Sequence, residues 1–458
     1  MSLQDVVSAK ASELDVPGVA VGVIHAGADE YAFHGVTSVE NPLPVNAATL
    51  FQAGSTTKTF TATALMRLVE QGRVALDAPV RTYVPELSLK DESVAAAVTV
   101  LQLLNHTAGW SGDLMDNTGD GDDALARYVE RMATLEQVSP LGATVSYNNA
   151  SLCLAGRVIE HVTGQTFEQA ARDLLLDPLG MADSYFFPSE VMTHRFAVGH
   201  NQKPDGTIHV ARNWALPRAV AAAGGITATV ADQLAWARFH LGDGTAADGT
   251  RLLSTELLTQ MQQPCADMAG SALGDHVGIS WLLKDVGGVR LVSHGGTTNG
   301  QHSAFVLVPE RQFAITSMTN CGPNGPQLND AVLAWALEHY LGVVEPDPLP
   351  VTLSDAELAP YTGTYETIAA SVDVAADAGR LVLRVQIKPG ALAALTEAGE
   401  EAADAQPPIP VGLISGAGDR YIVPDGPAKG MRGYFARNEQ GEIVGVHLGG
   451  RMAEKVRG

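Results

Sequence analysis

The tetrapeptide Ser55-Thr56-Thr57-Lys58 places a nucleophile and an amine one helical turn apart. An apolar-periodic stretch follows Gly54 and runs to Gly72, so we expect Ser55 to stand at a helix start. Residues three apart share a helix face, so the Lys58 amine can reach the Ser55 hydroxyl. The helix N-terminus adds positive potential where an oxyanion would form. The spacing indicates acyl transfer, although a serine cap followed by a solvated lysine has the same spacing.

A second motif, Tyr147-Asn148-Asn149, lies between a glycine turn and a helix predicted from Ala150. A phenol held against Lys58 can relay protons between nucleophile and leaving group. The Asn149 amide can orient both the lysine and a substrate carbonyl. A tyrosine packed under a turn, with Asn149 capping the next helix, is the structural alternative.

A third motif, His294-Gly295-Gly296-Thr297, stands just before a predicted pair of strands. Consecutive glycines let a substrate backbone approach a strand edge closely. The Thr297 N–H can share a developing oxyanion with the N–H of Ser55, which is the two-donor arrangement that acyl transfer needs. A plain glycine turn is the alternative here.

Together, and in this order, the three motifs resemble the serine β-lactamase and penicillin-binding-protein superfamily, in particular its class C-like branch of esterases, D-peptidases and related acyltransferases. The resemblance spans about residues 16 to 342. Three connecting phrases share it: Leu76-Asp77-Ala78-Pro79, Leu103-Leu104-Asn105-His106-Thr107-Ala108-Gly109-Trp110 and Ala223-Gly224-Gly225-Ile226.

The resemblance implies a role for each matched residue. Ser55 is implied as the nucleophile, Lys58 as its activating amine, and Tyr147 as the acid/base partner. Asn149 is implied as an orienting amide and His294 as the residue that opens the third motif. Gly295, Gly296 and Thr297 are implied to bind the oxyanion and substrate. We expect Trp110 and its loop to wall the acyl pocket, with a tryptophan that covers the core as the alternative. Whether Lys58 or Tyr147 is the base stays open, because the two can titrate as one unit.

The third motif departs from the superfamily in a way that bears on the substrate. Lys-Thr-Gly is typical of β-lactamases and DD-peptidases, whereas this chain has His294-Gly295-Gly296, a titratable imidazole in place of a fixed cation. We therefore expect a serine hydrolase that acts through a Ser55 acyl-enzyme on a small ester or on an amide or D-amino-acid peptide.

Three alternatives remain beside this expectation. In the first, an amine intercepts the acyl-enzyme, as in penicillin-binding-protein-type thioesterases that cyclise peptides. The second is a β-lactamase or DD-peptidase. The third is a module that binds or captures a ligand without turnover, which an intact set of Ser55, Lys58 and Tyr147 argues against.

The predicted elements define an α+β fold with a helical lobe and a lobe built on an antiparallel sheet, in the β-lactamase/transpeptidase-like arrangement that the resemblance implies. Strands are predicted at 18–24, 302–308 and 312–319, and helices up to 14 and at 101–104, 150–162, 167–175 and 327–341. We expect this catalytic domain to cover 1–343 and a proline-rich linker to cover 344–353. Short strand-like pieces at 361–365, 381–385, 420–423, 433–435 and 443–448 then predict a small all-β barrel domain over 354–458, which resembles a lipocalin.

Composition limits the possible partners. The formal charge of −22, without a Lys/Arg cluster, disfavours nucleic acid and anionic membranes, so we expect a small-molecule or short-peptide substrate. No signal sequence or membrane span is evident, which favours a cytoplasmic location and leaves a homo-oligomer open. We expect Cys153, Cys265 and Cys321 to be buried thiols, and no cofactor or metal site. The acidic loop 113–123 misses the EF-hand order and is expected to be solvated, and the Ala/Glu-rich stretch 391–405 to be a mobile loop.

Overall fold

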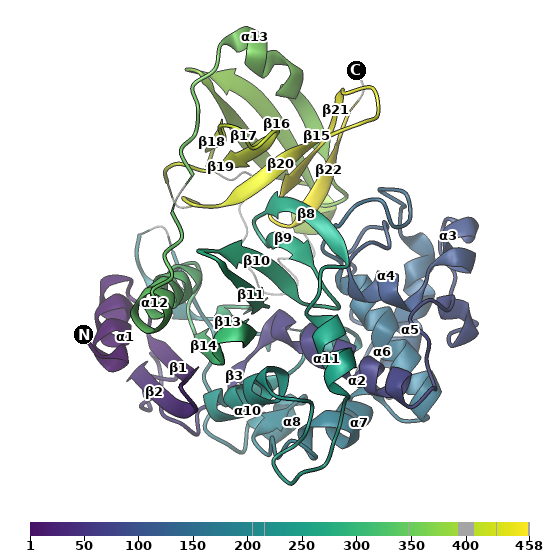
Figure 1. Ribbon diagram of the computed structural model, residues 1–458, viewed down its shortest axis with the longest axis vertical. Coiled ribbons are helices and arrows are strands. Elements are labelled where there is room, and N and C mark those ends of the chain that lie inside the picture. The colour runs from purple at the N-terminus through teal and green to yellow at the C-terminus, as the bar shows by residue number, and fades with distance from the viewer. Residues whose placement is uncertain (204, 215, 347, 393–406, 427, 457–458) are drawn as a thin grey trace.

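A nine-stranded antiparallel sheet lies at the centre of the first three quarters of the chain (Figure 1). The computed structural model describes residues 1–458 except 204, 215, 347, 393–406, 427 and 457–458. The sheet order is β2-β1-β14-β13-β11-β10-β9-β8, with β12 beside β13. Its strands are β1 (Gly18–His25), β2 (Ala28–Gly35), β8 (Ala266–Ser271), β9 (Gly274–Val277), β10 (Leu282–Val286), β11 (Val289–Ser293), β12 (Gly296–Thr298), β13 (Gln301–Val308) and β14 (Phe313–Thr319).

The N-terminal strand β1 pairs with the late strand β14, so the two ends of this region meet in one sheet. Seven of the eight residues of β1 are buried, which explains its unbroken apolar run. Helices α1 (Leu3–Glu13) and α12 (Asn324–Leu341) cover one face and share a core with β1 and β14. Helix α10 (Val230–Leu241) packs on the other face, where the core continues into the helices.

Helix α2 (Thr57–Glu70) is the centre of the helical lobe, because almost its whole circumference is buried. Its threonines are compatible with burial since their hydroxyls bond to backbone carbonyls, as Thr61 does to Ala222 at 2.7 Å. The helices of this lobe are α3 (Glu92–Ala97), α4 (Val100–Leu104), α5 (Ala124–Arg131), α6 (Asn149–Thr163), α7 (Phe167–Ala171) and α9 (Ala221–Gly224). α11 (Thr255–Met261) leads into β8, and a small sheet joins β3 (Phe51–Gln52), β7 (Thr227–Ala228) and β4 (Ser184–Tyr185).

A closed eight-stranded barrel follows and sits above β8 and β9 in Figure 1. It confirms the predicted all-β barrel. Its strands are β15 (Gly363–Glu366), β16 (Ala370–Asp377), β17 (Arg380–Ile387), β18 (Ile409–Leu413), β19 (Arg420–Ile422), β20 (Arg432–Arg437), β21 (Ile443–Leu448) and β22 (Arg451–Lys455). Pairing of β22 with β15 closes it. Three strands were not predicted, namely β16, β18 and β22. The domain limits at 343 and 353 stay predictions.

Two other expectations concern single segments. Cys153 and Cys321 are buried, but the prediction is wrong for Cys265, which is exposed where the chain enters β8 at the edge of the sheet. Nearly all of 391–405 lies outside the described residues. Among the helices of the described chain, none is long and apolar enough to cross a bilayer.

Candidate active site

Ser55 lies in a single 3₁₀ turn, Gly54–Thr56, that leads directly into α2. Gly54 has φ +54°, a conformation that side chains disfavour, so glycine allows the sharp entry into the helix. The Thr57 hydroxyl bonds back to the Gly54 carbonyl at 2.7 Å and accepts from the Ile226 N–H at 3.0 Å. The turn is thereby fixed between α2 and the Ala223–Ile226 phrase.

Lys58 is fully buried, and its Nζ donates to the Ser55 Oγ at 2.9 Å and to the Ala223 carbonyl at 2.7 Å. Burial disfavours the ammonium form and lowers the pKa of Lys58 to about 7. About half of the Lys58 amines are therefore neutral and able to act as a base at pH 7, and the geometry directs the amine at the serine.

Tyr147 faces the same pair from the loop before α6. Its ring centroid is 4.9 Å from Lys58 Nζ, and the side chain is 9% exposed. Burial raises the pKa of the Tyr147 phenol well above its usual value, while a hydrogen bond with Ser55 opposes that rise. The phenol is therefore protonated at neutral pH, in contact with the hydroxyl that it would serve.

The third motif lies against the first one. Gly296 is in β12, and a Cβ there would be 1.9 Å from the Ala53 carbonyl and 2.8 Å from the Ser55 backbone nitrogen. A Cβ at Gly54 would be 2.8 Å from the Thr297 nitrogen. Two glycines thus let β12 and the Ser55 turn approach through their backbones, which brings the backbone nitrogens of Ser55 and Thr297 into the same part of the site.

His294 is buried, and its ring centroid lies 6.1 Å from that of Tyr147. Burial and the nearby Lys58 lower the pKa of His294 to about 3, and its Nδ1 bonds with the Gly295 carbonyl at 2.7 Å. The imidazole is therefore neutral across the physiological range. It replaces the fixed cation of Lys-Thr-Gly with an uncharged group.

The two asparagines of the second motif divide their roles in an unexpected way. Asn148, rather than Asn149, caps α6, because its Oδ1 accepts from the Ser151 N–H at 2.8 Å. The Asn149 Nδ2 donates to Asp113 at 3.0 Å. The structure thus gives Asn149 a carboxylate partner in addition to its place beside Tyr147.

Trp110 lies in the core of the helical lobe and is only 1% exposed. Its backbone carbonyl accepts from the Asn148 side chain at 2.8 Å. A side chain with so little free surface offers nothing to a substrate, so the structure does not support the expected role of the Trp110 side chain as a pocket wall. Its aromatic bulk fills the core instead.

His106, in one of the shared phrases, was not singled out as a site residue. Its φ is +59°, a conformation that few residues other than glycine adopt, and its ring lies 4.6 Å from that of Tyr147. Its Nδ1 accepts from the Asn148 N–H at 3.1 Å, so the imidazole supports the Tyr147 loop directly. The segment Asn105-His106-Thr107, which the resemblance shares, was the sequence signal that could have indicated His106 as a site residue.

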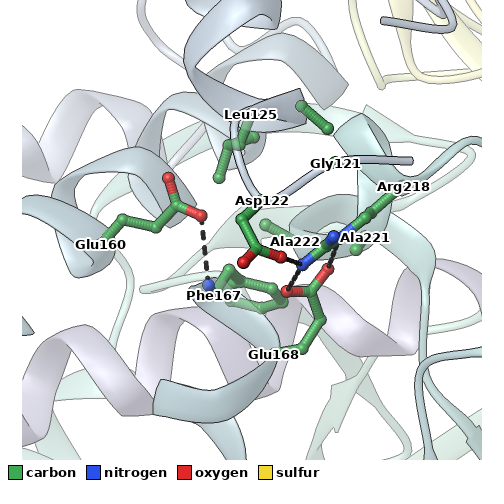
Figure 2. Close-up of a pocket in the computed structure, with 10 residues that line it drawn as sticks. Gly121, Asp122, Leu125, Glu160, Phe167, Glu168, Arg218, Ala221 and Ala222 are labelled. Carbon is green, nitrogen blue, oxygen red and sulfur yellow. Dashed lines mark hydrogen bonds and ion pairs between the residues drawn. The ribbon is translucent and has the colours of Figure 1, made fainter. Parts of the chain in front are cut away.

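Ion pairs hold both ends of the acidic loop 113–123. Figure 2 shows the pocket at its far end, where Arg218 lies between Asp122 and Glu168. Arg218 pairs with Glu168 at 3.0 Å and with Asp122 at 2.9 Å. At the near end Asp113 pairs with Arg451 of the barrel. The prediction of a solvated loop holds at the far end, where the Asp122 side chain is 84% exposed, but not for Asp113, which is partly buried against Arg451. Asp113 and Arg451 are site neighbours that the sequence did not indicate.

The comparisons with known proteins agree with this fold. The family model described as Beta-lactamase matches residues 3–339, and the chain therefore belongs to the Beta-lactamase family. Penicillin-binding protein 4 of Amycolatopsis lactamdurans is 35% identical over 360 residues, which cover 78% of this chain and 94% of that protein. The resemblance seen in the motifs is thus confirmed.

Three solved structures match nearly the whole chain, including the barrel. The crystal structure of SurE has a TM-score of 0.78 at 26% identity and covers 99% of this chain and 98% of its own, and a second structure of SurE contains D-Leu. The octameric penicillin-binding protein homologue from Pyrococcus abyssi has a TM-score of 0.64 at 23% identity and covers 98% of each chain. The latter shows a shared fold, and its assembly is a property of that homologue.

Proposed function

We propose that this chain is a serine hydrolase that forms an acyl-enzyme on Ser55 from a small ester or amide, with D-amino-acid peptides among its substrates. The observation that carries the proposal is the hydrogen bond between a fully buried lysine, whose pKa is about 7, and a serine hydroxyl. Such a lysine can accept a proton at neutral pH, which an exposed lysine cannot do effectively.

In the proposed mechanism the Lys58–Tyr147 pair takes the Ser55 proton as Oγ attacks the acyl carbon. The backbone N–H groups of Ser55 and Thr297 stabilise the tetrahedral oxyanion. Gly54 and Gly296 allow the two backbones to approach this closely. The pair then protonates the leaving group. Water completes the cycle by attacking the ester that joins the acyl group to Ser55.

Two observations support the choice of substrate class. His294 is neutral, so it gives no fixed cation for the carboxylate of a β-lactam or a peptidoglycan stem. The SurE structure that contains D-Leu belongs to a protein alike over nearly the whole chain, which supports an acyl donor ending in a D-residue. We therefore propose esters and D-amino-acyl compounds as substrates in preference to β-lactams and DD-peptides.

Transfer of the acyl group to an amine is a second candidate. Lys58 and His294 beside Ser55 have almost no exposed surface, while Ser55 itself is partly exposed. A substrate that covers Ser55 would shield the acyl-enzyme from water and favour an amine nucleophile of its own over bulk hydrolysis. Peptide cyclisation would use the same residues as hydrolysis.

A panel of activated substrates tests the proposal. Peptide thioesters that differ only in a C-terminal D- or L-residue, p-nitrophenyl butyrate and nitrocefin are incubated with the protein, and intact and digested protein are examined by mass spectrometry. We expect an acyl adduct on the peptide that contains Ser55, a preference for the D-residue, and no adduct on Ser55→Ala. Free acid or cyclic peptide in the products separates hydrolysis from amine transfer. Acylation at another residue would refute the assignment.

A further inference from the structure

The barrel reaches the catalytic region through the hairpin that joins β21 and β22. Leu448 pairs with Arg451, so the hairpin loop consists of Gly449 and Gly450, whose φ values are +56° and +85°. Two-residue loops with positive φ at both positions strongly favour glycine. A Cβ on Gly450 would lie 2.5 Å from the Leu273 side chain, so glycine also permits the close approach to the β8–β9 hairpin.

This hairpin contacts the loop that carries Tyr147. The Gly450 carbonyl accepts a hydrogen bond from the Tyr147 backbone N–H at 2.9 Å, and the Met452 N–H donates to the Ser146 hydroxyl at 3.4 Å. The guanidinium of Arg451 stands over the Tyr147 ring, with its central carbon 5.3 Å from the ring centroid. A residue of the barrel thus contacts the ring that the proposed mechanism uses.

Arg451 is also held by a bidentate ion pair with Asp113, in which Nε lies 2.5 Å from Oδ2 and Nη2 lies 2.7 Å from Oδ1. The same Oδ1 accepts from the Asn149 amide at 3.0 Å. The remaining nitrogen, Nη1, donates to the Gly449 carbonyl at 3.3 Å. All three nitrogens of the guanidinium are engaged within the protein, which suits a group that holds its neighbours rather than one that binds a substrate anion.

We propose that Arg451 is a positioning residue for acylation of Ser55, through which the barrel holds Tyr147 against Lys58 and, by way of Asp113, orients the Asn149 amide. The inference rests on the proposed function and extends it. The barrel is then a component of the acylation site, not only a stabilising appendage.

The charge of Arg451 affects the pKa of Lys58, which a merely structural contact would not do. Arg451 lowers the pKa of Lys58 and Asp113 raises it. Loss of the guanidinium therefore raises the pKa of Lys58, and loss of the carboxylate charge lowers it. The other titratable groups facing Lys58 are uncharged near neutral pH because burial shifts each pKa toward the neutral form: His106, Tyr147, Cys153 and His294.

The test measures the rate of Ser55 acylation by p-nitrophenyl butyrate as a function of pH. Arg451→Met should slow acylation about 10- to 100-fold, because small misplacements of catalytic groups have effects of that size, and should move the midpoint of the pH profile upward. Arg451→Lys keeps the charge but cannot form the bidentate pair, so the rate should fall while the midpoint stays near that of wild type. Asp113→Asn should slow acylation and move the midpoint downward.

Arg432→Met is the matched control, because Arg432 pairs with Glu345 in the segment before the barrel. It should acylate within about twofold of wild type, as surface ion pairs contribute little. Thermal unfolding reports folding for every variant. If Arg451→Met does not fold, Arg451→Lys and Asp113→Asn decide the outcome.

Unchanged rates and midpoints in the folded variants would overturn the inference while leaving Ser55 acylation intact. Absence of acylation in wild type would instead refute the proposed function. The two failures are therefore distinguishable.

Discussion

The Nζ of Lys58 lies 2.9 Å from the Oγ of Ser55, in a helix turn whose lysine has no exposed surface. The pair combines a short contact with removal of the amine from water. Contact alone would leave a cationic donor, and burial alone would leave a neutral amine with nothing to deprotonate. Their coincidence makes the pH dependence of acylation the most direct measurement on this protein.

Acylation of Ser55 should increase with pH through a midpoint near 7. The amine must be neutral to accept the serine proton, and burial lowers the pKa of Lys58 to about 7, so the active fraction grows as pH rises past that value. Stopped-flow burst rates with p-nitrophenyl butyrate between pH 5 and 9.5 measure this. A profile still rising steeply at pH 9.5 would show that Lys58 keeps an ordinary pKa.

Lys58→Arg should lower the acylation rate by about 10²- to 10⁴-fold, the range typical of a lost general base. The guanidinium stays protonated at every accessible pH, so it cannot accept the serine proton. Lys10→Arg, on the exposed side of α1 where Lys10 pairs with Glu13, is the control and should behave as wild type. A Lys58→Arg protein that retains the midpoint near 7 would move the base role to another group.

Gly296→Ala should reduce acylation far more than Gly295→Ala. The added Cβ at 296 would meet the Ala53 carbonyl at 1.9 Å and the Ser55 nitrogen at 2.8 Å, which forces β12 away from the nucleophile turn. At 295 the nearest atom is the Ser303 carbonyl at 3.1 Å. We expect a loss of about 10²-fold or more at 296, the scale of a lost oxyanion donor, and less than about tenfold at 295. Equal losses would show that the glycines have no specific role.

The free energy of unfolding should fall as pH decreases from about 6.5 toward 4. Burial lowers the pKa of His240 and His294 to about 3 and of His302 and His447 to about 4. Between those values and the unfolded pKa of about 6.5, the unfolded chain binds more protons, so acid favours unfolding. Urea denaturation at pH 7.5, 6 and 5 measures the slope.

His240→Leu provides the matched variant for that slope. His240 lies in the core between Trp236 and Trp281, distinct from the Ser55 motifs, and its Nδ1 is buried without a hydrogen-bond partner. Leucine removes one titrating group, so stability should depend less steeply on pH below 6.5. An unaltered slope would mean that His240 titrates in the same way in the folded and unfolded states.

Much of this arrangement could be predicted because it is encoded locally. The spacing of Ser55 and Lys58 is a property of one helix turn, and the apolar runs of β1, β13 and β14 mark buried strands. The barrel was predicted from its short strand-like segments, yet β16, β18 and β22 were missed. Ala-Ala-Asp in β16 and Met-Ala-Glu-Lys in β22 are poor strand formers. Tertiary pairing in a closed barrel overrides that preference.

Contacts between distant segments were not predictable in the same way. Arg451 and Asp113 are 338 residues apart, and neither stands in a motif. Gly449-Gly450 after a predicted strand is a hairpin signal, but nothing local states which surface the hairpin meets. The different roles of Asn148 and Asn149 were not predictable either. A shift of the helix start by one residue decides which amide caps α6 and which one bonds to Asp113.

The strand that closes the barrel is also the strand that brings Arg451 to Tyr147. During synthesis Ser55 and Lys58 therefore leave the ribosome long before Arg451 can contact Tyr147. Until residue 451 has emerged and β22 has paired, Tyr147 of a nascent chain lacks its contact with Arg451. The proposed role of Arg451 therefore predicts that a nascent chain acylates Ser55 slowly until β22 has closed the barrel.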